Sequence, residues 1–139
     1  MEFNISDLVY KKNEDLKLPK TEDRPLIHFT QQTGEFEMSG RSILDDSGGF
    51  YARLTDWVVS YSEYYPNKLI TLILDLEYVN TSGHTYLLGF IHELASKNLQ
   101  VEWYYETEDQ EEIGEEYYNL LDAPFTLINK LNGDKTVLP

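Results

Sequence analysis

The feature that most constrains the fold is a run of apolar residues at 68–79, KLITLILDLEYV. The run is nearly continuous in Leu and Ile, which is typical of an interior strand in a sheet with both faces covered. It ends in a polar stretch at 80–83, NTSG, after which a helical apolar pattern restarts at Leu87. Such polar and small residues favour turns and helix N-termini. The sequence therefore predicts a strand buried on both faces that leads through a short turn into a helix.

The rest of the chain predicts strands and helices that alternate. Strands are expected at 16–20 as a short edge strand, at 24–30 and 34–40 as a β-hairpin, and at 99–106 and 124–131. A loop is expected at 41–49, and helices at 50–65, from the NTSG turn to Lys97-Asn98, and at 107–121. Strands that alternate with helices favour parallel pairing, so we predict an α/β fold with a single mixed β-sheet flanked by helices.

The length of 139 residues suits one domain. We expect this domain to span 16–131, between an N-terminal tail at 1–15 and a C-terminal tail at 132–139.

The balance of charge limits the partners. Asp and Glu number 25 against 11 Lys and Arg, which gives a net charge of −14. Such a surface repels phosphate backbones and anionic lipid, so nucleic acid and membranes are poor partners and a basic protein patch is a better one. The chain has no cysteine, no apolar run of about 18 residues and no long apolar core near its start, so we expect a cytoplasmic protein without a signal peptide or membrane span.

The sequence gives only weak signals for a catalytic or metal-binding site. His84 and His92 are eight residues apart and do not form H-E-x-x-H, so ordinary histidines are the simpler interpretation. The acidic residues between 106 and 116 lack the calcium-loop pattern and favour a solvated helix face. Asp75 and Glu77 come near the end of a strand, where α/β sites usually lie, but no base or nucleophile accompanies them. We therefore expect no metal, no cofactor and no enzymatic activity, and an enzyme that uses these carboxylates is our most distant hypothesis.

The turn after the long strand allows two interpretations. Asn80, Thr81 and Ser82 are residue types that cap helices, because their side-chain oxygens accept hydrogen bonds from the free N–H groups of the first turn. The same position suits a phosphorylated hydroxyl, since the phosphate would lie among N–H donors at the positive end of a helix. The residues alone favour the cap and leave both interpretations open.

Several segments resemble the SiaC-type family of bacterial regulatory phosphoproteins. The most specific are LEYVNTS, beginning at Leu76, and the strand end in LQVEWYYETEDQEEIGEEY, beginning at Leu99. The segments PFTLI, RPLIHF, GEFEMSGRS and FYARLTDWV agree as well, so the resemblance covers about 16–128. The chain departs from the family pattern in the loop at 41–49, and Gly83 and Thr85 stand where the family often has a second serine and a lysine.

The resemblance implies a STAS-like, or anti-anti-sigma-like, fold and a signalling switch that is not an enzyme. It implies phosphorylation of Thr81, with Ser82 as second choice, by a dedicated protein kinase, and removal of the phosphate by a PP2C-like phosphatase. The unmodified form would bind and activate a diguanylate cyclase and so act on cyclic-di-GMP signalling and biofilm behaviour. The expected partner-binding residues surround the turn: Tyr78, Asn80, Thr81, Ser82, Gly83 and His84. The alternative is an unmodified STAS-like module that binds a protein or a small ligand.

Overall fold

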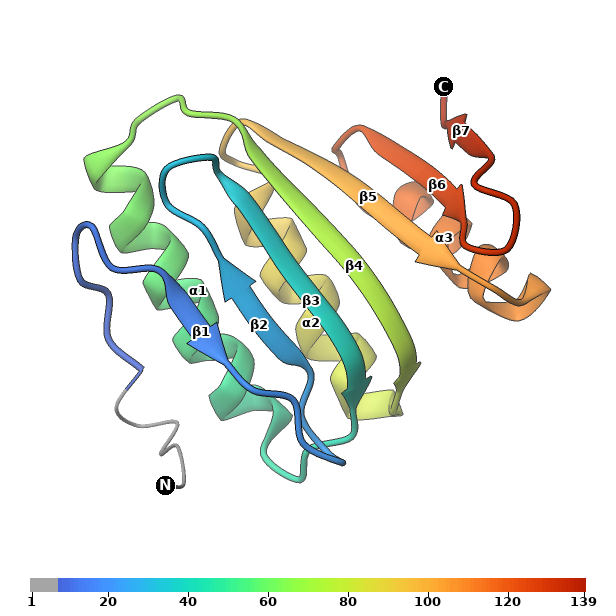
Figure 1. Cartoon of the computed structure of the whole chain (residues 1–139), viewed down its shortest axis with the longest axis horizontal. Coiled ribbons are helices and arrows are strands. Elements are labelled where there is room, and N and C mark those ends of the chain that lie inside the picture. Colours follow the sequence, from blue (N-terminus) through green and yellow to red (C-terminus); the bar gives the residue numbers. More distant parts are fainter. Residues whose placement is uncertain (1–7) are drawn as a thin grey trace.

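The computed structural model describes residues 8–139 and arranges them as one sheet of seven strands with three helices (Figure 1). The elements in chain order are β1 (Leu16–Leu18), β2 (Leu26–Phe29), β3 (Glu35–Ser42), α1 (Ser47–Tyr64), β4 (Ile70–Val79), α2 (Thr81–Leu94), β5 (Leu99–Tyr105), α3 (Glu108–Leu120), β6 (Phe125–Asn129) and β7 (Lys135–Val137).

The strands lie side by side in chain order, from β1 at one edge to β7 at the other. The pairs from β3 to β6 are parallel, while β1–β2, β2–β3 and β6–β7 are antiparallel. The predicted single mixed sheet is therefore confirmed, and so is the interior position of β4, which lies between β3 and β5.

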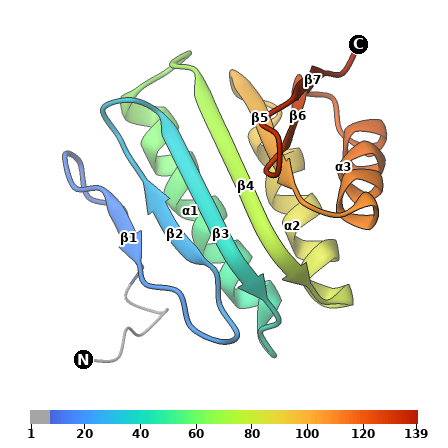
Figure 2. The same cartoon turned by 45° about the vertical axis from the view of Figure 1, so that its right-hand side comes forward.

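All three helices lie on one side of the sheet (Figures 1 and 2). Each joins a parallel strand to the next strand in the same direction across the sheet. Because such crossovers are nearly always of one hand, a sheet wound in one direction collects its helices on one face. Trp103 confirms this placement: it pairs with Leu74 and packs against Gly114 of α3.

The expectation that β4 is buried on both faces is wrong. Its residues alternate, and the four that face the helices are buried: Ile70, Leu72, Leu74 and Leu76. On the opposite face, Thr71, Ile73 and Asp75 are half-buried and Glu77 is exposed. The alternation is present in the sequence, but Ile73 and the flanking Leu69 hide it within a dense apolar run. The sheet is thus covered on one face by the helices and open on the other among the described residues.

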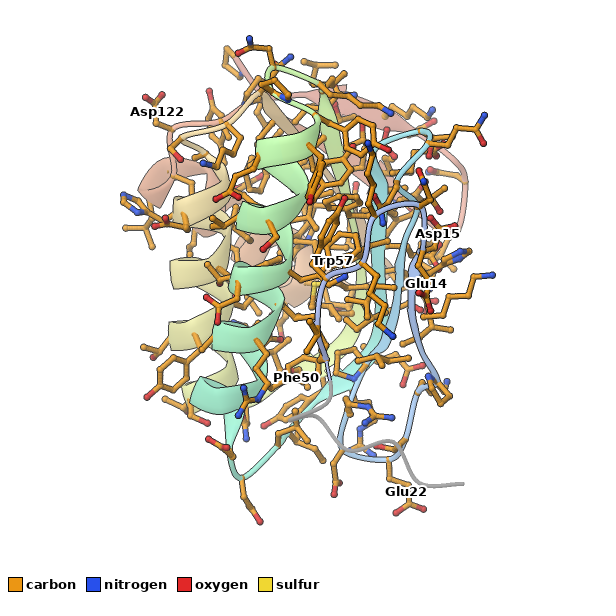
Figure 3. The ribbon with its side chains drawn as sticks, turned by 90° about the vertical axis from the view of Figure 1, so that its left-hand side faces the viewer. Glu14, Asp15, Glu22, Phe50, Trp57 and Asp122 are labelled. Carbon is orange, nitrogen blue, oxygen red and sulfur yellow. The ribbon has the colours of Figure 1, made fainter. Side chains whose placement is uncertain are left out.

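The core between the helices and the sheet is strongly aromatic. Phe50 and Trp57 of α1 are 0% and 2% exposed and point toward the sheet (Figure 3). The Trp57 ring packs edge-on against Phe29 and Phe36, with ring centroids 5.7 Å apart in each case. Buried aromatic rings contribute large apolar areas and specific geometry. This packing fixes α1 on the sheet beside α2, and so places the N-termini of the two helices next to each other.

Both segments expected as tails carry structure, although 1–7 of the first lie outside the described residues. Leu8 is buried, and the Tyr10 hydroxyl donates a 2.6 Å hydrogen bond to Oε1 of Gln31. Near the other end, β7 pairs with β6 through a turn at Gly133, whose positive φ of 77° favours glycine. All three residues of β7 are exposed, so this strand lacks the apolar alternation that made β1 recognisable from the sequence.

Candidate functional site

The turn after β4 leads directly into α2, and Thr81 is the first residue of that helix. The Thr81 side chain is exposed, and its hydroxyl makes no hydrogen bond with the described residues. The structure thus confirms that Thr81 lies at a helix N-terminus with its hydroxyl reachable from solvent. A hydroxyl in this position is available for chemical modification.

Asn80, and not Thr81, is the cap of α2. Its side-chain oxygen accepts a 2.8 Å hydrogen bond from the backbone N–H of Gly83. The Ser82 hydroxyl lies 3.3 Å from the same oxygen. Because Asn80 satisfies the first turn, the hydroxyl of Thr81 is not needed for capping. Asn80 is therefore the cap, and the Thr81 hydroxyl has no capping role.

Gly83 is buried in the first turn of α2, where the helix touches the end of β3. A Cβ atom at this position would lie 2.8 Å from Val79 Cγ1 and 3.0 Å from the carbonyl oxygen of Ser42. The same carbonyl oxygen accepts a 3.0 Å hydrogen bond from the N–H of Asn80. Glycine is thus required at this position, because a larger side chain would collide with Val79 and with the backbone of β3.

The N-terminus of α1 forms the neighbouring wall of the site. The helix begins at Ser47 with Asp46 as its cap, three residues earlier than the expected start at Phe50. The hydroxyls of Ser47 and Ser82 are 3.4 Å apart. The expected loop at 41–49 therefore contains the first turn of α1. Asp46 before Ser47 is a capping signal that the pair Gly48-Gly49 obscures.

Two exposed aromatic side chains lie close to Thr81 in the sequence, one on each side of it. Tyr78, near the end of β4, is 57% exposed, and Tyr86 of α2 is 46% exposed. The ring of Tyr86 lies over Gly48, where an added Cβ would be 3.0 Å from it. Exposed tyrosines are common in protein interfaces, because they offer a large rigid area with a polar end. Tyr78 was among the expected partner residues, whereas nothing in the local pattern indicated Tyr86.

His84, in the first turn of α2, contacts α3. Its Nδ1 lies 2.6 Å from the hydroxyl of Tyr117, and the two rings are edge-on with centroids 5.7 Å apart. The imidazole is half-buried, and this burial lowers its pKa, while the nearby carboxylate of Glu116 acts in the opposite direction. Tyr117 is a neighbour that the sequence could not reveal, because it comes from a distant helix.

The first turn of α2, which begins at Thr81, differs in charge from the first turn of α3. The first turns of α1 and α2 contain no acidic residue, although the chain has a net charge of −14. The first turn of α3, in contrast, contains Glu108, Asp109 and Glu111. The acids that suit the positive end of a helix are thus present at α3 and absent at α2.

The remaining candidate residues lie apart from this turn. Asp75 faces the open side of the sheet, where Lys130 Nζ lies 2.9 Å from its Oδ1 and 3.2 Å from Oε1 of Glu106. Among residues 8–139, no group of three or more His, Asp or Glu side chains is placed to hold a metal ion. The described helices include none that is long and apolar enough to cross a membrane.

Comparison with known proteins assigns the chain to a family and supports the fold. The model of the SiaC family of regulatory phosphoproteins matches residues 18–130. An uncharacterized protein of Pseudomonas aeruginosa strain UCBPP-PA14 is 26% identical over 120 residues, which cover 81% of this chain and 94% of that protein.

Two solved structures of SiaC from Pseudomonas aeruginosa have a similar fold. Apo-SiaC is 26% identical with a TM-score of 0.70, and the match covers 82% of this chain and 98% of that chain. SiaC bound as activator to the diguanylate cyclase SiaD is 25% identical with a TM-score of 0.76, and the match covers 83% and 99%.

Proposed function

Since this chain belongs to the SiaC family of regulatory phosphoproteins, we propose that it is a switch whose partner binding is controlled by phosphorylation of Thr81, with Ser82 as second choice. The observation that carries the proposal is the position of Thr81. It is exposed and first in α2, its hydroxyl makes no hydrogen bond with residues 8–139, and another residue provides the cap. A kinase can reach this hydroxyl without unfolding the turn.

The electrostatics of the turn support a phosphate at this position. A phosphate adds about −1.5 to −2 charges near neutral pH. Negative charge at a helix N-terminus is favourable by about 0.3–1 kcal/mol, and the first turn of α2 has no acid to provide it. The fold should therefore tolerate the modification, so that its main effect falls on a partner seated over the turn.

We propose a diguanylate cyclase as that partner, by analogy with SiaC, which forms a complex with SiaD as its activator. The unmodified protein would bind the cyclase, act in cyclic-di-GMP signalling and biofilm regulation, and work in the cytoplasm. The exposed side chains of Tyr78, Thr81, Ser82 and Tyr86 would form the contact surface. Of the other expected partner residues, Asn80 and Gly83 hold the turn, and His84 links it to α3.

The proposal requires two further proteins and no catalysis by this chain. A dedicated protein kinase would add the phosphate, and a PP2C-like phosphatase would remove it. The carboxylate of Asp75, the strongest of the weak catalytic candidates, is occupied by its ion pair with Lys130. We accordingly propose that the protein itself is not an enzyme and acts only by binding.

A binding measurement with the SiaD-like diguanylate cyclase of the native host tests this function. Wild type and Thr81→Ala should bind, while Thr81→Glu should bind at least about tenfold more weakly, a loss of roughly 1.4 kcal/mol. Gln32→Glu is the matched control, because it adds one negative charge at an exposed position at the other end of the sheet. Equal binding by Thr81→Glu and wild type would contradict the switch and favour a module that is not regulated by phosphate.

A further inference from the structure

The link between His84 and Tyr117 is the feature of the site that the proposed function leaves unused. It joins the first turn of α2 to α3 through a hydrogen bond of 2.6 Å. Tyr117 is only 3% exposed, and its ring lies against the indole of Trp103 with centroids 4.9 Å apart. The indole N–H donates in turn to the carbonyl oxygen of Gln110 in α3, at 3.0 Å. His84 is therefore connected, through Tyr117, to the residues that pack α3 against β5.

The direction of this hydrogen bond depends on the tautomer of His84. Burial raises the pKa of Tyr117, so its hydroxyl stays protonated. We assign the imidazole proton to Nε2, so that Nδ1 accepts from this hydroxyl. Among the described residues, the titratable side chains that act on this imidazole are Tyr117 and Glu116, both from α3. A positive imidazole in the first turn would also oppose the helix dipole.

Thr81 and His84 are three residues apart on one helix. Residues at this spacing are neighbours on the helix surface, with Cβ atoms about 5–6 Å apart. Helical side chains generally lean toward the helix N-terminus, which is the end of α2 where Thr81 lies. The α2 sequence, TSGHTYLLGFIHEL, contains no Lys or Arg, so His84 is the residue in its first two turns that can become a cation.

Given the proposed phosphorylation of Thr81, on which this inference rests, we propose that the imidazole of His84 detects the phosphate and transmits its presence to α3 through the hydroxyl of Tyr117. The phosphate stabilises a positive imidazole, which takes its second proton from solvent onto Nδ1. Nδ1–H then donates, and the Tyr117 hydroxyl must rotate to accept. The modification thereby reverses the direction of one hydrogen bond between α2 and α3.

An NMR titration of the histidine side chains tests the inference. Phosphothreonine is placed at 81 during translation, so that the result does not depend on a kinase, and unmodified protein is compared with it. The pKa of His84 should rise by about one or more, as for a group next to an opposite charge. His28 and His92, both exposed and outside this turn, serve as internal controls. A change at His84 no larger than theirs would overturn the proposal.

Tyr117→Phe separates detection from transmission. In this variant the phosphate should still raise the pKa of His84, but the α3 amide resonances should lose most of their response to the phosphate. An α3 response as large as in wild type would overturn the role of Tyr117. Because phosphothreonine is introduced during translation, this result does not depend on whether the native protein is phosphorylated. Phosphorylation of the native protein is a separate question, and it tests the proposed function.

Discussion

The backbone N–H of Asn80 donates a 3.0 Å hydrogen bond to the carbonyl oxygen of Ser42. This bond ties the cap of α2 to the last residue of β3. It explains why Thr81, the next residue, can be exposed and yet held in one place. Two hydrogen bonds hold the turn: the one from Asn80 N–H to β3, and the one that the Asn80 side chain accepts from Gly83 N–H.

Gly83→Ala should destabilise the protein by about 1–3 kcal/mol, because the added methyl group meets the Ser42 carbonyl and the side chains of Val79 and Asn80. Gly89→Ala is the matched control in the same helix, where an added Cβ has nothing within 4 Å. This control should instead stabilise by about 0.5–1 kcal/mol. Denaturant unfolding measures both, and equal effects of the two substitutions would show that the close approach at Gly83 does not exist.

Asn80→Ala should cost about 1 kcal/mol of unfolding free energy, because it removes the side-chain oxygen that accepts from Gly83 N–H. Asn80→Asp keeps an acceptor and should remain near wild type. Thr81→Ala should also remain near wild type, since Thr81 is not the cap. Thermal or denaturant unfolding distinguishes these cases, and a larger loss in Thr81→Ala than in Asn80→Ala would reverse the assignment of the cap.

Stability should fall at alkaline pH because of Tyr51. Burial raises its pKa to about 12, while the 2.8 Å hydrogen bond with Ser42 acts in the opposite direction. An unfolded tyrosine has a pKa of about 10. The stabilisation from the protonated hydroxyl is therefore complete below pH 10 and is lost as pH rises toward 12, by on the order of 2 kcal/mol.

Tyr51→Phe checks this alkaline effect. The variant should be less stable than wild type near neutral pH, by about 1 kcal/mol, because the Ser42 hydroxyl loses its partner. Its unfolding free energy should then depend less steeply on pH between 10 and 12, although Tyr61, whose pKa burial also raises to about 12, keeps some dependence. Parallel pH profiles for the two proteins would show that Tyr51 does not carry the effect.

The purified protein should not turn over generic phosphoester, ester or nucleotide substrates. Asp75 is paired with Lys130, and this pair fits an electrostatic link between β4 and the turn after β6 better than a catalytic role. Any activity that Asp75→Asn or Glu77→Gln abolishes would show that these carboxylates are catalytic. Turnover that survives both substitutions points to a contaminating enzyme.

The sequence predicts the parts of the site that depend on local pattern. The NTSG stretch and the stripe beginning at Leu87 place Thr81 at the start of α2, because helix caps and periodicity are local properties. The position of β4 inside the sheet also followed from its apolar density, but its uncovered face did not. Which face is covered depends on the strand order, and that order is set by contacts between distant elements.

The neighbours of Thr81 could not be predicted in the same way. Ser47 lies beside Ser82, and Gly48 beside Tyr86, only because α1 and α2 pack together. Tyr117 reaches His84 from α3. No spacing in the chain relates these residues. The extended first turn of α1 was hidden by Gly48 and Gly49, which disfavour a helix when propensity alone is considered.

The most direct test of the switch is mass spectrometry of the protein purified from its native host, with and without its phosphatase. We predict a phosphate on Thr81 in part of the wild-type protein, at a higher fraction when the phosphatase is inactivated. Thr81→Ala should carry no phosphate in the peptide that spans the turn. A Thr81 that stays unmodified in both backgrounds, or a phosphate found only on another residue such as Ser82, would contradict regulation through Thr81.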